Sequence, residues 1–395
     1  MNNPKIRFKR YTDDWEQRKF GEIFIEYSEK NHLELPPLTI IQGGGTVKRN
    51  ESDRNILYDK SSLSNYKLVK KDDFILHLRS FEGGLEKATC DGIVSPAYHT
   101  FHGINADSRF YYSYFRSFDF IKKKLVPHIY GIRDGKSIDV NGMKSIKIPY
   151  PTYIEQKKMG DYIDYFDNLL TFYKRKCEEI KTLKKYMLQK MFPQNGMNIP
   201  KIRFDGFTDA WEQRKLPEFV EFFNGLTYTP DDVRESGTLV LRSSNVKNGE
   251  IVDADNVYVE SEKVTSENVK VGDIVVVVRN GSRALIGKHA EIKENMPNTV
   301  IGAFMSGIRS KHSSFVNALL DTSQFEKEIE KNMGATINQI TGYMFSKMEF
   351  MIPSSAEQER IGNYFKSLDH LITLHQRKCD ELQSIRKFML QNMFV

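Results

Sequence analysis

Arginine recurs beside glycine, serine or asparagine in two long segments of the sequence, at places where strands are expected to end. Arginine can bond guanine O6 and N7, asparagine can bond adenine, and serine and lysine can hold phosphates. The later segment offers Arg242, Ser243, Asn245, Arg279, Asn280, Ser282, Arg283 and Lys288. The earlier segment offers Lys48, Arg49, Arg54, Arg79, Ser80, Arg133, Asp134 and Lys136, with Tyr130 available to stack or bond. These groups are candidate DNA contacts, although loop charges that face only water have the same composition.

Motifs for catalysis are missing from the sequence. Residues 42–48, QGGGTVK, lack the GxxxxGK[ST] spacing of a phosphate-binding loop. His99 and His102 have no acidic or cysteine partner at a metal-ligand spacing, so we predict local packing for both and no metal site. No Asn/Asp-Pro-Pro-Tyr motif for amino methylation occurs, and residues 230–232, PDD, lack the following lysine of a nuclease cluster. The pattern favours binding over catalysis.

The composition is that of a folded protein with a modest positive charge. The 395 residues carry 58 Lys+Arg against 52 Asp+Glu, a net charge of +6, which permits a polyanionic partner without requiring one. Three scattered cysteines predict neither disulfides nor a metal site, and they favour a reducing compartment. The N-terminal residues lack the apolar core of a signal peptide, and no apolar run approaches the length of a membrane helix. We therefore expect a cytoplasmic protein without a membrane partner.

Two segments of the chain each occur twice in similar form, and we call these repeated segments frames. Residues 5–19, KIRFKRYTDDWEQRK, match residues 201–215, KIRFDGFTDAWEQRK, and residues 155–192 match residues 357–394 at nearly half of their positions. Between these frames, residues 20–150 and 216–352 barely resemble each other. Such self-similarity predicts two copies of one architecture with divergent interiors.

The repeated tails are predicted to be helices because their apolar residues recur every three or four positions. Each stripe needs a partner in water, and an antiparallel pairing of the two helices, each roughly 55 Å long, would make the chain pseudo-twofold. Both cysteines within the tails fall on the stripe and are expected to pack in it. The predicted inter-helix residues are Phe166, Leu170, Cys177, Ile180 and Met187, with Leu368, Ile372, Cys379, Leu382 and Met389.

The segments between the frames are predicted to be mixed α/β domains. Residues 273–279 and 237–246 have the composition of strands, residues 314–333 that of one helix, and residues 122–124 that of a solvated helix face. The predicted fold is α+β, with two domains at residues 1–154 and 196–356 and two helical spacers at residues 155–195 and 357–395.

This paired pattern resembles the specificity subunit of type I restriction-modification enzymes over essentially the whole chain. The resemblance rests on WEQRK at Trp15 and Trp211, and on residues 144–156, KSIKIPYPTYIEQ, and 346–358, SKMEFMIPSSAEQ, which lead into the repeated helices. Residues 272–274, GDI, followed by 286–288, IGK, are similar to a family target-recognition domain. The first segment is similar at residues 130–135, YGIRDG, but its interior departs from the GDI…GK pattern.

The resemblance implies a non-catalytic subunit that binds a bipartite double-stranded DNA target. Each variable domain would read one half of the target, and the helices would set the unread gap. Two modification (methyltransferase) subunits and the restriction/translocase subunits would be its partners. S-adenosylmethionine, ATP and Mg would be used by those partners, with no cofactor bound directly by this chain.

Two other function classes remain open at the level of sequence. A fused enzyme would need an S-adenosylmethionine loop and an amino-methylation motif, and neither is present. A non-enzymatic protein-binding scaffold would bind its partners without sequence preference on DNA, whereas contacts to phosphates weaken steeply as salt rises.

Overall fold

A computed structural model of the protein describes residues 4–52, 60–76, 84–131, 137–194, 196–333 and 338–394. The chain forms two compact units. The first unit comprises Met1–Lys174 with Arg377–Val395, and the second comprises Arg175–Gln376. Each unit thus contains one variable domain together with parts of both long helices. Among the described residues, no helix has the length and apolar composition that crossing a membrane requires.

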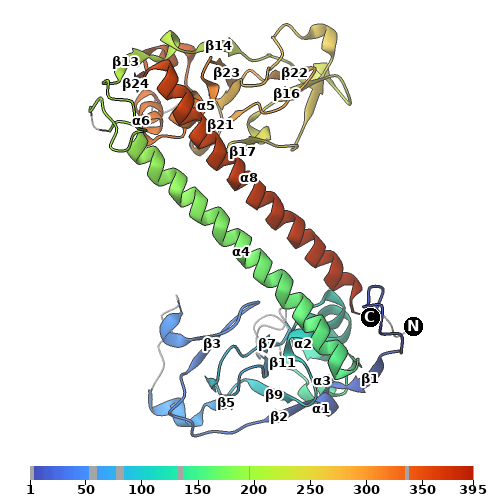
Figure 1. Ribbon diagram of the computed structural model, residues 1–395. Helices are drawn as coiled ribbons and strands as arrows, with labels where there is room; N and C mark the ends of the chain where they lie inside the picture. The colour runs from blue at the N-terminus through green and yellow to red at the C-terminus, as the bar shows by residue number, and fades with distance from the viewer. Residues whose placement is uncertain are drawn as a thin grey trace. The chain divides into compact units, whose positions relative to one another are not determined.

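The first unit is built from short strands and a few helices (Figure 1). Its α-helices are α1 (Phe20–Ile23), α2 (Ser108–Phe115), α3 (Val140–Lys144) and the first part of α4 (Tyr153–Met191), and a π-helix spans Asp119–Leu125. Its strands are β1 (Glu16–Lys19), β2 (Phe24–Tyr27), β3 (Leu38–Ile41), β4 (Gly45–Lys48), β5 (Lys67–Val69), β6 (Phe74–Leu76), β7 (Glu86–Lys87), β8 (Gly92–Val94), β9 (His99–Gly103), β10 (Ile129–Tyr130), β11 (Ser137–Ile138) and β12 (Lys147–Tyr150).

An antiparallel four-stranded sheet of order β2-β9-β6-β7 holds the main core of the first unit. Phe24, Phe74 and Phe101 point from this sheet into a cluster that also takes Phe110 and Phe115 of α2. Phe24 and Phe74 meet edge to face, with ring centroids 5.3 Å apart. This arrangement of the rings is favourable, so the aromatic cluster fixes α2 against the sheet.

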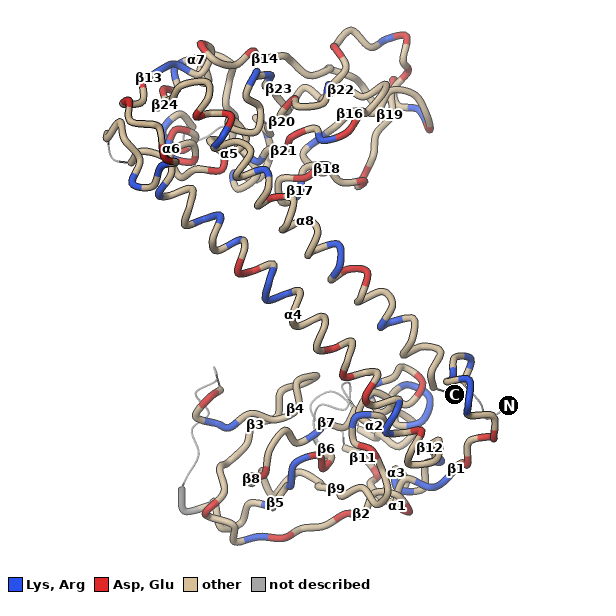
Figure 2. The backbone as a smooth tube through the Cα atoms, viewed as in Figure 1, with Lys and Arg blue, Asp and Glu red and all other residues tan. Residues whose placement is uncertain are grey.

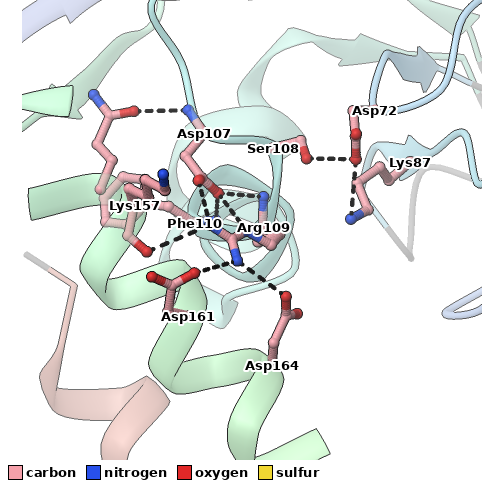
Figure 3. A network of polar contacts seen from close by, with 10 residues as sticks. Asp72, Lys87, Asp107, Ser108, Arg109, Phe110, Lys157, Asp161 and Asp164 are labelled. Carbon is pink, nitrogen blue, oxygen red and sulfur yellow. Dashed lines mark hydrogen bonds and ion pairs between the residues drawn. The ribbon is translucent and has the colours of Figure 1, made fainter. Parts of the chain in front are cut away.

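The start of α2 is tied to α4 by a polar network within the first unit (Figure 3). Asp107 caps α2, because its Oδ1 accepts from the backbone N–H groups of Arg109, at 2.9 Å, and Phe110, at 3.3 Å. The Arg109 guanidinium then bonds Asp107 and reaches Asp161 at 2.6 Å and Asp164 at 3.2 Å on α4. Three carboxylates around one guanidinium raise the pKa of Arg109, chiefly through the Asp107 hydrogen bond, so it stays charged.

The second unit repeats this plan but joins its strands into two four-stranded sheets instead of one. Its helices are α5 (Ser313–Leu320), α6 (Ser323–Asn332), α7 (Gly342–Lys347), the remainder of α4 and the first part of α8 (Ser355–Asn392). Its strands are β13 (Glu212–Lys215), β14 (Glu221–Asn224), β15 (Val233–Arg234), β16 (Thr238–Leu241), β17 (Val246–Lys247), β18 (Glu250–Ile251), β19 (Val257–Val259), β20 (Ile274–Val277), β21 (His289–Glu291), β22 (Thr299–Ile301), β23 (Met305–Arg309) and β24 (Glu349–Ile352).

Two four-stranded sheets organise the second unit. One has the order β14-β23-β20-β21 and corresponds to the sheet of the first unit, while the other has the order β15-β19-β16-β22. Every residue of β20 is buried, which explains why residues 274–277 form an uninterrupted apolar run. The predicted strand at residues 273–279 is confirmed by β20.

The repeated frames close each variable domain at the base of a long helix. In the first unit β1 pairs with β12, and in the second β13 pairs with β24 in the same antiparallel register. Next to each pair, an arginine makes a two-point ion pair with a glutamate at the start of the long helix: Arg7 with Glu155, and Arg203 with Glu357. Both glutamate side chains are only 1% exposed. The duplicated sequence is thus a duplicated clasp between domain and helix.

The long helices pack antiparallel within each unit. In the second unit Cys177 lies near Ile372 and Gln376, Lys184 bonds Asp369, and the ring of Phe192 meets that of Phe365. In the first unit Arg386 bonds Asp167 at 2.5 Å. Because residues 167 and 184 correspond to 369 and 386 in the repeat, the two ion pairs are the same contact with the helices exchanged. The predicted α+β fold with a pseudo-twofold repeat and long spacer helices is confirmed.

The ten residues predicted to lie between the helices are placed unequally. Leu170, Cys177, Leu368, Cys379 and Leu382 are buried, whereas Phe166, Ile180, Met187, Ile372 and Met389 are half-buried. Ile180 and Met187 pack against the second unit's core, and Met389 packs against the first unit's core. The apolar stripe therefore serves the domains as well as the facing helix.

Three expectations about local structure need correction. The single helix predicted at residues 314–333 is broken into α5 and α6, because buried Thr322 begins a new helix by accepting from the Phe325 N–H. The strand predicted at residues 237–246 ends at Leu241, where the chain turns. Lys124 is not on a solvated face, since burial lowers its pKa and its Nζ donates to the Lys147 carbonyl at 3.0 Å.

Candidate nucleic-acid interface

The ends of β16 and β20 converge in the second unit and bring together predicted DNA contacts. Asn280, just after β20, donates from Nδ2 to the Ser243 hydroxyl, just after β16, at 2.9 Å. The Asn280 Oδ1 accepts from the backbone N–H of Ser282 at 2.9 Å, which shapes the following turn. Because the asparagine amide joins both loops, their positions depend on each other.

Phe304 lies beside these loops, in the turn between β22 and β23. Its carbonyl accepts from the backbone N–H groups of Val278, at 3.0 Å, and Arg279, at 3.2 Å. The Arg279 guanidinium lies over the Phe304 ring, 4.9 Å from its centroid. Phe304 is nevertheless 55% exposed, so a large apolar ring faces solvent next to a cation.

Three predicted cations of this region lack a carboxylate partner in the part of the chain that the structure describes. Arg279, Arg283 and Lys288 are exposed, and none of them forms an ion pair with the described acidic side chains. Arg242 differs, because its guanidinium bonds the Asp255 carboxylate at 2.5 Å. Figure 2 shows basic and acidic residues mixed over the second unit, so cations without acidic partners are informative. They leave positive charge available for phosphates or base edges.

The predicted contacts of the second unit divide between two clefts. Arg242 and Ser243 line a cleft of about 610 Å³ together with Phe304. Arg283 and Lys288 line another, of about 790 Å³, beside α6. Ser282 is exposed in the loop between them. The structure therefore gathers this set along one loop, residues 279–288, with the end of β16 joined to its beginning.

Asn245 is a correction, because its side chain is 1% exposed and cannot reach DNA in this conformation. Its Oδ1 accepts from the Arg242 N–H at 2.9 Å, and its Nδ2 donates to the Ala254 carbonyl at 2.8 Å and to Asn256 Oδ1 at 2.9 Å. Asn245 thus holds the turn after β16, and it is a structural residue.

Fewer of the DNA contacts predicted for the first unit lie among the described residues. Lys48 is exposed at the end of β4 and pairs with Glu51 at 3.4 Å, while Arg49 packs over the Tyr66 ring. Tyr130 is 59% exposed on the separate two-stranded ribbon β10–β11. The other predicted contacts lie outside the described residues: Arg54, Arg79, Ser80, Arg133, Asp134 and Lys136.

Comparison with known proteins decides the family. Residues 12–182 and 208–384 each match the family model described as the type I restriction modification DNA specificity domain. The chain belongs to this family. Each match spans one variable domain and most of the long helix that follows it, so the internal repeat is a repeat of the family domain.

Relatives of this specificity-domain chain match it over part or nearly all of its length. The specificity subunit of the type I restriction enzyme MjaVIII from Methanocaldococcus jannaschii is 24% identical over 400 residues, 96% of this chain and 91% of that protein. The EcoKI specificity subunit of Escherichia coli is 24% identical over 189 residues, 45% of this chain and 40% of that protein. The crystal structure of the S subunit from M. genitalium has a TM-score of 0.65 at 16% identity, covering 100% of this chain and 99% of that one.

The GDI motif of the specificity domain has a structural counterpart where the sequence of the first unit departs from it. Asp273 and Asp73 each accept from the backbone N–H three residues earlier, that of Lys270 and that of Lys70. Gly272 has a φ of +91°, and Asp72 adopts +73° in its place. An L residue rarely adopts a positive φ. Because Asp72 does so, the first unit retains the turn although its sequence lacks the Gly-Asp-Ile motif.

The buried Asp73 of this turn is the hydrogen-bond partner of His102, one of the two histidines considered in the sequence analysis. His102 donates to Asp73 at 2.7 Å, and at the equivalent strand position Arg309 makes a two-point ion pair with Asp273. His99 pairs separately with Glu26 at 2.5 Å. Each histidine therefore has a carboxylate partner, but His102 is exposed and only His99 is half-buried, so the predicted packing role does not hold for His102. The described residues contain no group of three or more His, Cys, Asp or Glu side chains that could hold a metal ion.

Phe304 is the residue of this interface that the sequence did not reveal. Phenylalanine is ordinarily a core residue, and nothing in GAFM at residues 302–305 signals that its ring is exposed. Gly302 marks a turn, but a glycine does not tell whether the side chain that follows faces solvent or the core.

Proposed function

We propose that this chain is the DNA specificity subunit of a type I restriction-modification assembly and has no catalytic role of its own. Each variable domain reads one half of a bipartite double-stranded target, and this directs adenine methylation or restriction by partner subunits. The observation that carries the proposal is the pair of DNA specificity domains, at residues 12–182 and 208–384, whose interiors diverge while their frames repeat. Divergent readers on identical frames suit a target with two different halves.

The charges of the second unit support a DNA partner. Arg279, Arg283 and Lys288 lie within ten residues of each other and lack carboxylate partners among the described residues. Contacts of this kind to phosphates release counterions, so affinity should fall as salt concentration rises. A protein-binding scaffold would show no such dependence and no sequence preference.

The long helices support the proposal that two modification (methyltransferase) subunits bind the chain. Each unit exposes a corresponding set of apolar side chains on α4 and α8: Phe172, Ile385 and Phe388 in the first unit, and Leu374, Leu183 and Tyr186 in the second. These residues are pairwise equivalent in the repeat, with the two helices exchanged. Two equivalent apolar faces suit two copies of the same partner.

The partners would supply the chemistry. In this proposal the modification subunits use S-adenosylmethionine, the restriction/translocase subunits use ATP and Mg, and this chain binds none of them directly. A solved structure with a TM-score of 0.51 and 17% identity is described as showing complex assembly of the type I R-M system, which fits a subunit of a larger assembly.

The decisive experiment maps adenine methylation across a genome by single-molecule sequencing, in cells that carry the modification partner with or without this chain. We expect a split methylated motif that depends on the chain. A methylation pattern that is unchanged by the chain, despite soluble expression and complex formation, would contradict the proposal and favour the scaffold.

Exchange of one variable domain tests whether the two halves are read independently. Replacing residues 216–352 with the corresponding segment of another specificity subunit should change one half of the motif and leave the other intact. A change in both halves would show that the two domains do not read separately.

A further inference from the structure

An apolar cleft opens next to the loops that carry Arg242, Ser243, Arg279 and Asn280. Its volume is about 610 Å³, and Leu226, Tyr228, Val257 and Met305 form much of its lining. The cleft lies where three segments of the second unit meet: the chain after β14, the end of β16, and the turn between β22 and β23. It therefore combines apolar walls with polar groups able to bond a base edge.

Phe304 stands at this cleft on a rigid turn. Besides the two hydrogen bonds to the Phe304 carbonyl, the neighbouring Ala303 N–H donates to the Leu226 carbonyl at 2.9 Å and the Leu226 N–H donates to the Ile301 carbonyl at 2.7 Å. Gly225 permits this close approach, because a Cβ there would lie 2.0 Å from the Gly302 carbonyl oxygen. The backbone that carries the ring is thus held in place before any ligand binds, which lowers the entropy cost of contact.

The surroundings of Phe304 favour a ligand that carries negative charge and also presents a small apolar group. Arg279 brings a positive charge over the ring without a described carboxylate partner, and the Asn280–Ser243 pair lies beside it. The exposed ring costs free energy in water, and a cation over its face offsets only part of that cost. A duplex DNA edge meets both demands, since it carries phosphates and, at thymine alone, a methyl group in the major groove.

We propose that Phe304 contacts the 5-methyl group of a thymine and makes one position of the second variable domain's half-site specific for that base. The inference rests on the proposed function and names a specificity-determining residue for it. Arg279 then contacts the neighbouring phosphate or base edge, while Asn280 holds the Ser243 loop beside it. The competing occupant, the sugar–phosphate backbone alone, would pack on Phe304 regardless of the base.

The test removes the methyl group from the DNA instead of only removing the ring from the protein. The chain is assembled with its modification subunits, and its affinity is measured for duplexes in which each thymine of the half-site is replaced singly by deoxyuridine. We expect a loss of about fourfold at one position, the value that corresponds to burying one methyl group. In Phe304→Ala this deoxyuridine effect should disappear at that position, while Phe304→Leu should retain it in part.

Phe118, an exposed phenylalanine of the first unit, supplies the matched control. Phe118→Ala should leave the deoxyuridine effect in this half-site unchanged. The inference is overturned if no thymine methyl affects binding by the wild-type complex, if the half-site contains no thymine, or if Phe304→Ala keeps the same effect. In all three cases sequence-specific binding persists and the proposed function stands, whereas an assembled complex without any sequence preference would refute the proposed function itself.

Discussion

Glu155 and Glu357 hold equivalent positions at the starts of the long helices, but their hydrogen bonds differ by one. Glu155 accepts from Arg7 and also from the Trp15 indole nitrogen, at 3.2 Å. Glu357 accepts from Arg203, while the indole nitrogen of Trp211 is buried without a partner among the described residues. The two repeats can therefore be compared directly. The Glu155 carboxylate accepts from an arginine and a tryptophan, whereas the Glu357 carboxylate accepts from an arginine.

We expect Arg203→Met to destabilise the second unit more than Arg7→Met destabilises the first. Removing one partner of a buried ion pair typically costs about 3–5 kcal/mol, and Glu155 keeps the Trp15 donor. Each unit contains one tryptophan, so urea unfolding can be followed by fluorescence of Trp211 in a Trp15→Phe background and of Trp15 in a Trp211→Phe background. Equal losses would show that the Trp15 hydrogen bond contributes nothing.

His289 is expected to make the stability of the second unit depend on pH. Both ring nitrogens face acceptors, the Gly287 carbonyl at 3.0 Å and the Asp321 carboxylate at 3.4 Å, and only the protonated ring donates to both. Burial and the nearby Lys184 oppose protonation, but the Asp321 contacts prevail and raise the pKa of His289 above its ordinary 6.5. The folded state therefore holds a proton that the unfolded state releases first, and its stabilisation is lost as pH rises from 6.5 through the raised pKa.

Unfolding of the second unit between pH 5.5 and pH 9 checks this sign. Relative to His289→Gln, the wild-type protein should lose unfolding free energy as the pH rises through this window. His370→Gln, at an exposed histidine of α8, is the control and should behave like wild type. A His289→Gln protein with the wild-type pH slope would mean that another group titrates.

At the scale of the element, the start of α2 depends on one carboxylate. Asp107 both caps the helix and holds Arg109 against α4. We expect Asp107→Ala to destabilise the first unit by about 1–2 kcal/mol through loss of the cap. Asp107→Asn should cost less, because the amide oxygen still caps and Arg109 still pairs with Asp161 and Asp164.

Trp15 fluorescence during urea unfolding, in the Trp211→Phe background, measures this order of stability. Ser108→Ala removes only the exposed bond to Asp72 and should be nearly neutral. If the alanine and asparagine variants are equally stable, the cap has no role and the charge of Asp107 accounts for the whole effect.

Elements with strong periodicity could be predicted from the sequence, and elements decided by tertiary contacts could not. The long helices follow from apolar spacing and the buried β20 from its four consecutive β-branched residues. The break between α5 and α6 could not be seen, because periodicity continues across it. It places Asp321 against Lys184 and His289, residues far away in the sequence.

The candidate interface divides in the same way. Arg279, Asn280 and Ser243 could be named from residue types at strand ends, and the structure does bring them together. Asn245 was chosen on the same rule, but its amide is consumed by the backbone of its own turn. Residue type cannot distinguish an asparagine that reads a ligand from one that shapes a loop, because both need the same donors and acceptors.

At the scale of the whole molecule, the proposed assembly with two modification subunits predicts a stepwise loss of these partners. Tyr186 and Phe388 are equivalent exposed residues of the two units. Tyr186→Asp and Phe388→Asp should each reduce the assembly from two modification subunits to one, and the double variant should bind none, because a carboxylate is costly in an apolar interface. Native mass spectrometry counts the copies directly.

Val271→Asp is the matched control for these substitutions, because Val271 is an exposed apolar residue in a loop of the second unit and belongs to neither helix face. It should retain both copies. Full assembly by the double variant would show that the helix faces do not bind the modification subunits.

The first unit combines segments that lie far apart in the chain, and this affects how it folds during synthesis. Its core includes Met393 and takes Met389 and Phe394 as neighbours, yet these residues are translated only after the whole of residues 196–356. The first domain therefore remains incomplete on the ribosome while the second is being synthesised. Part of its apolar surface stays uncovered until the end of α8 has been made. Completion of the first domain should therefore wait for synthesis of α8, and a premature stop soon after α8 begins should destabilise the first domain.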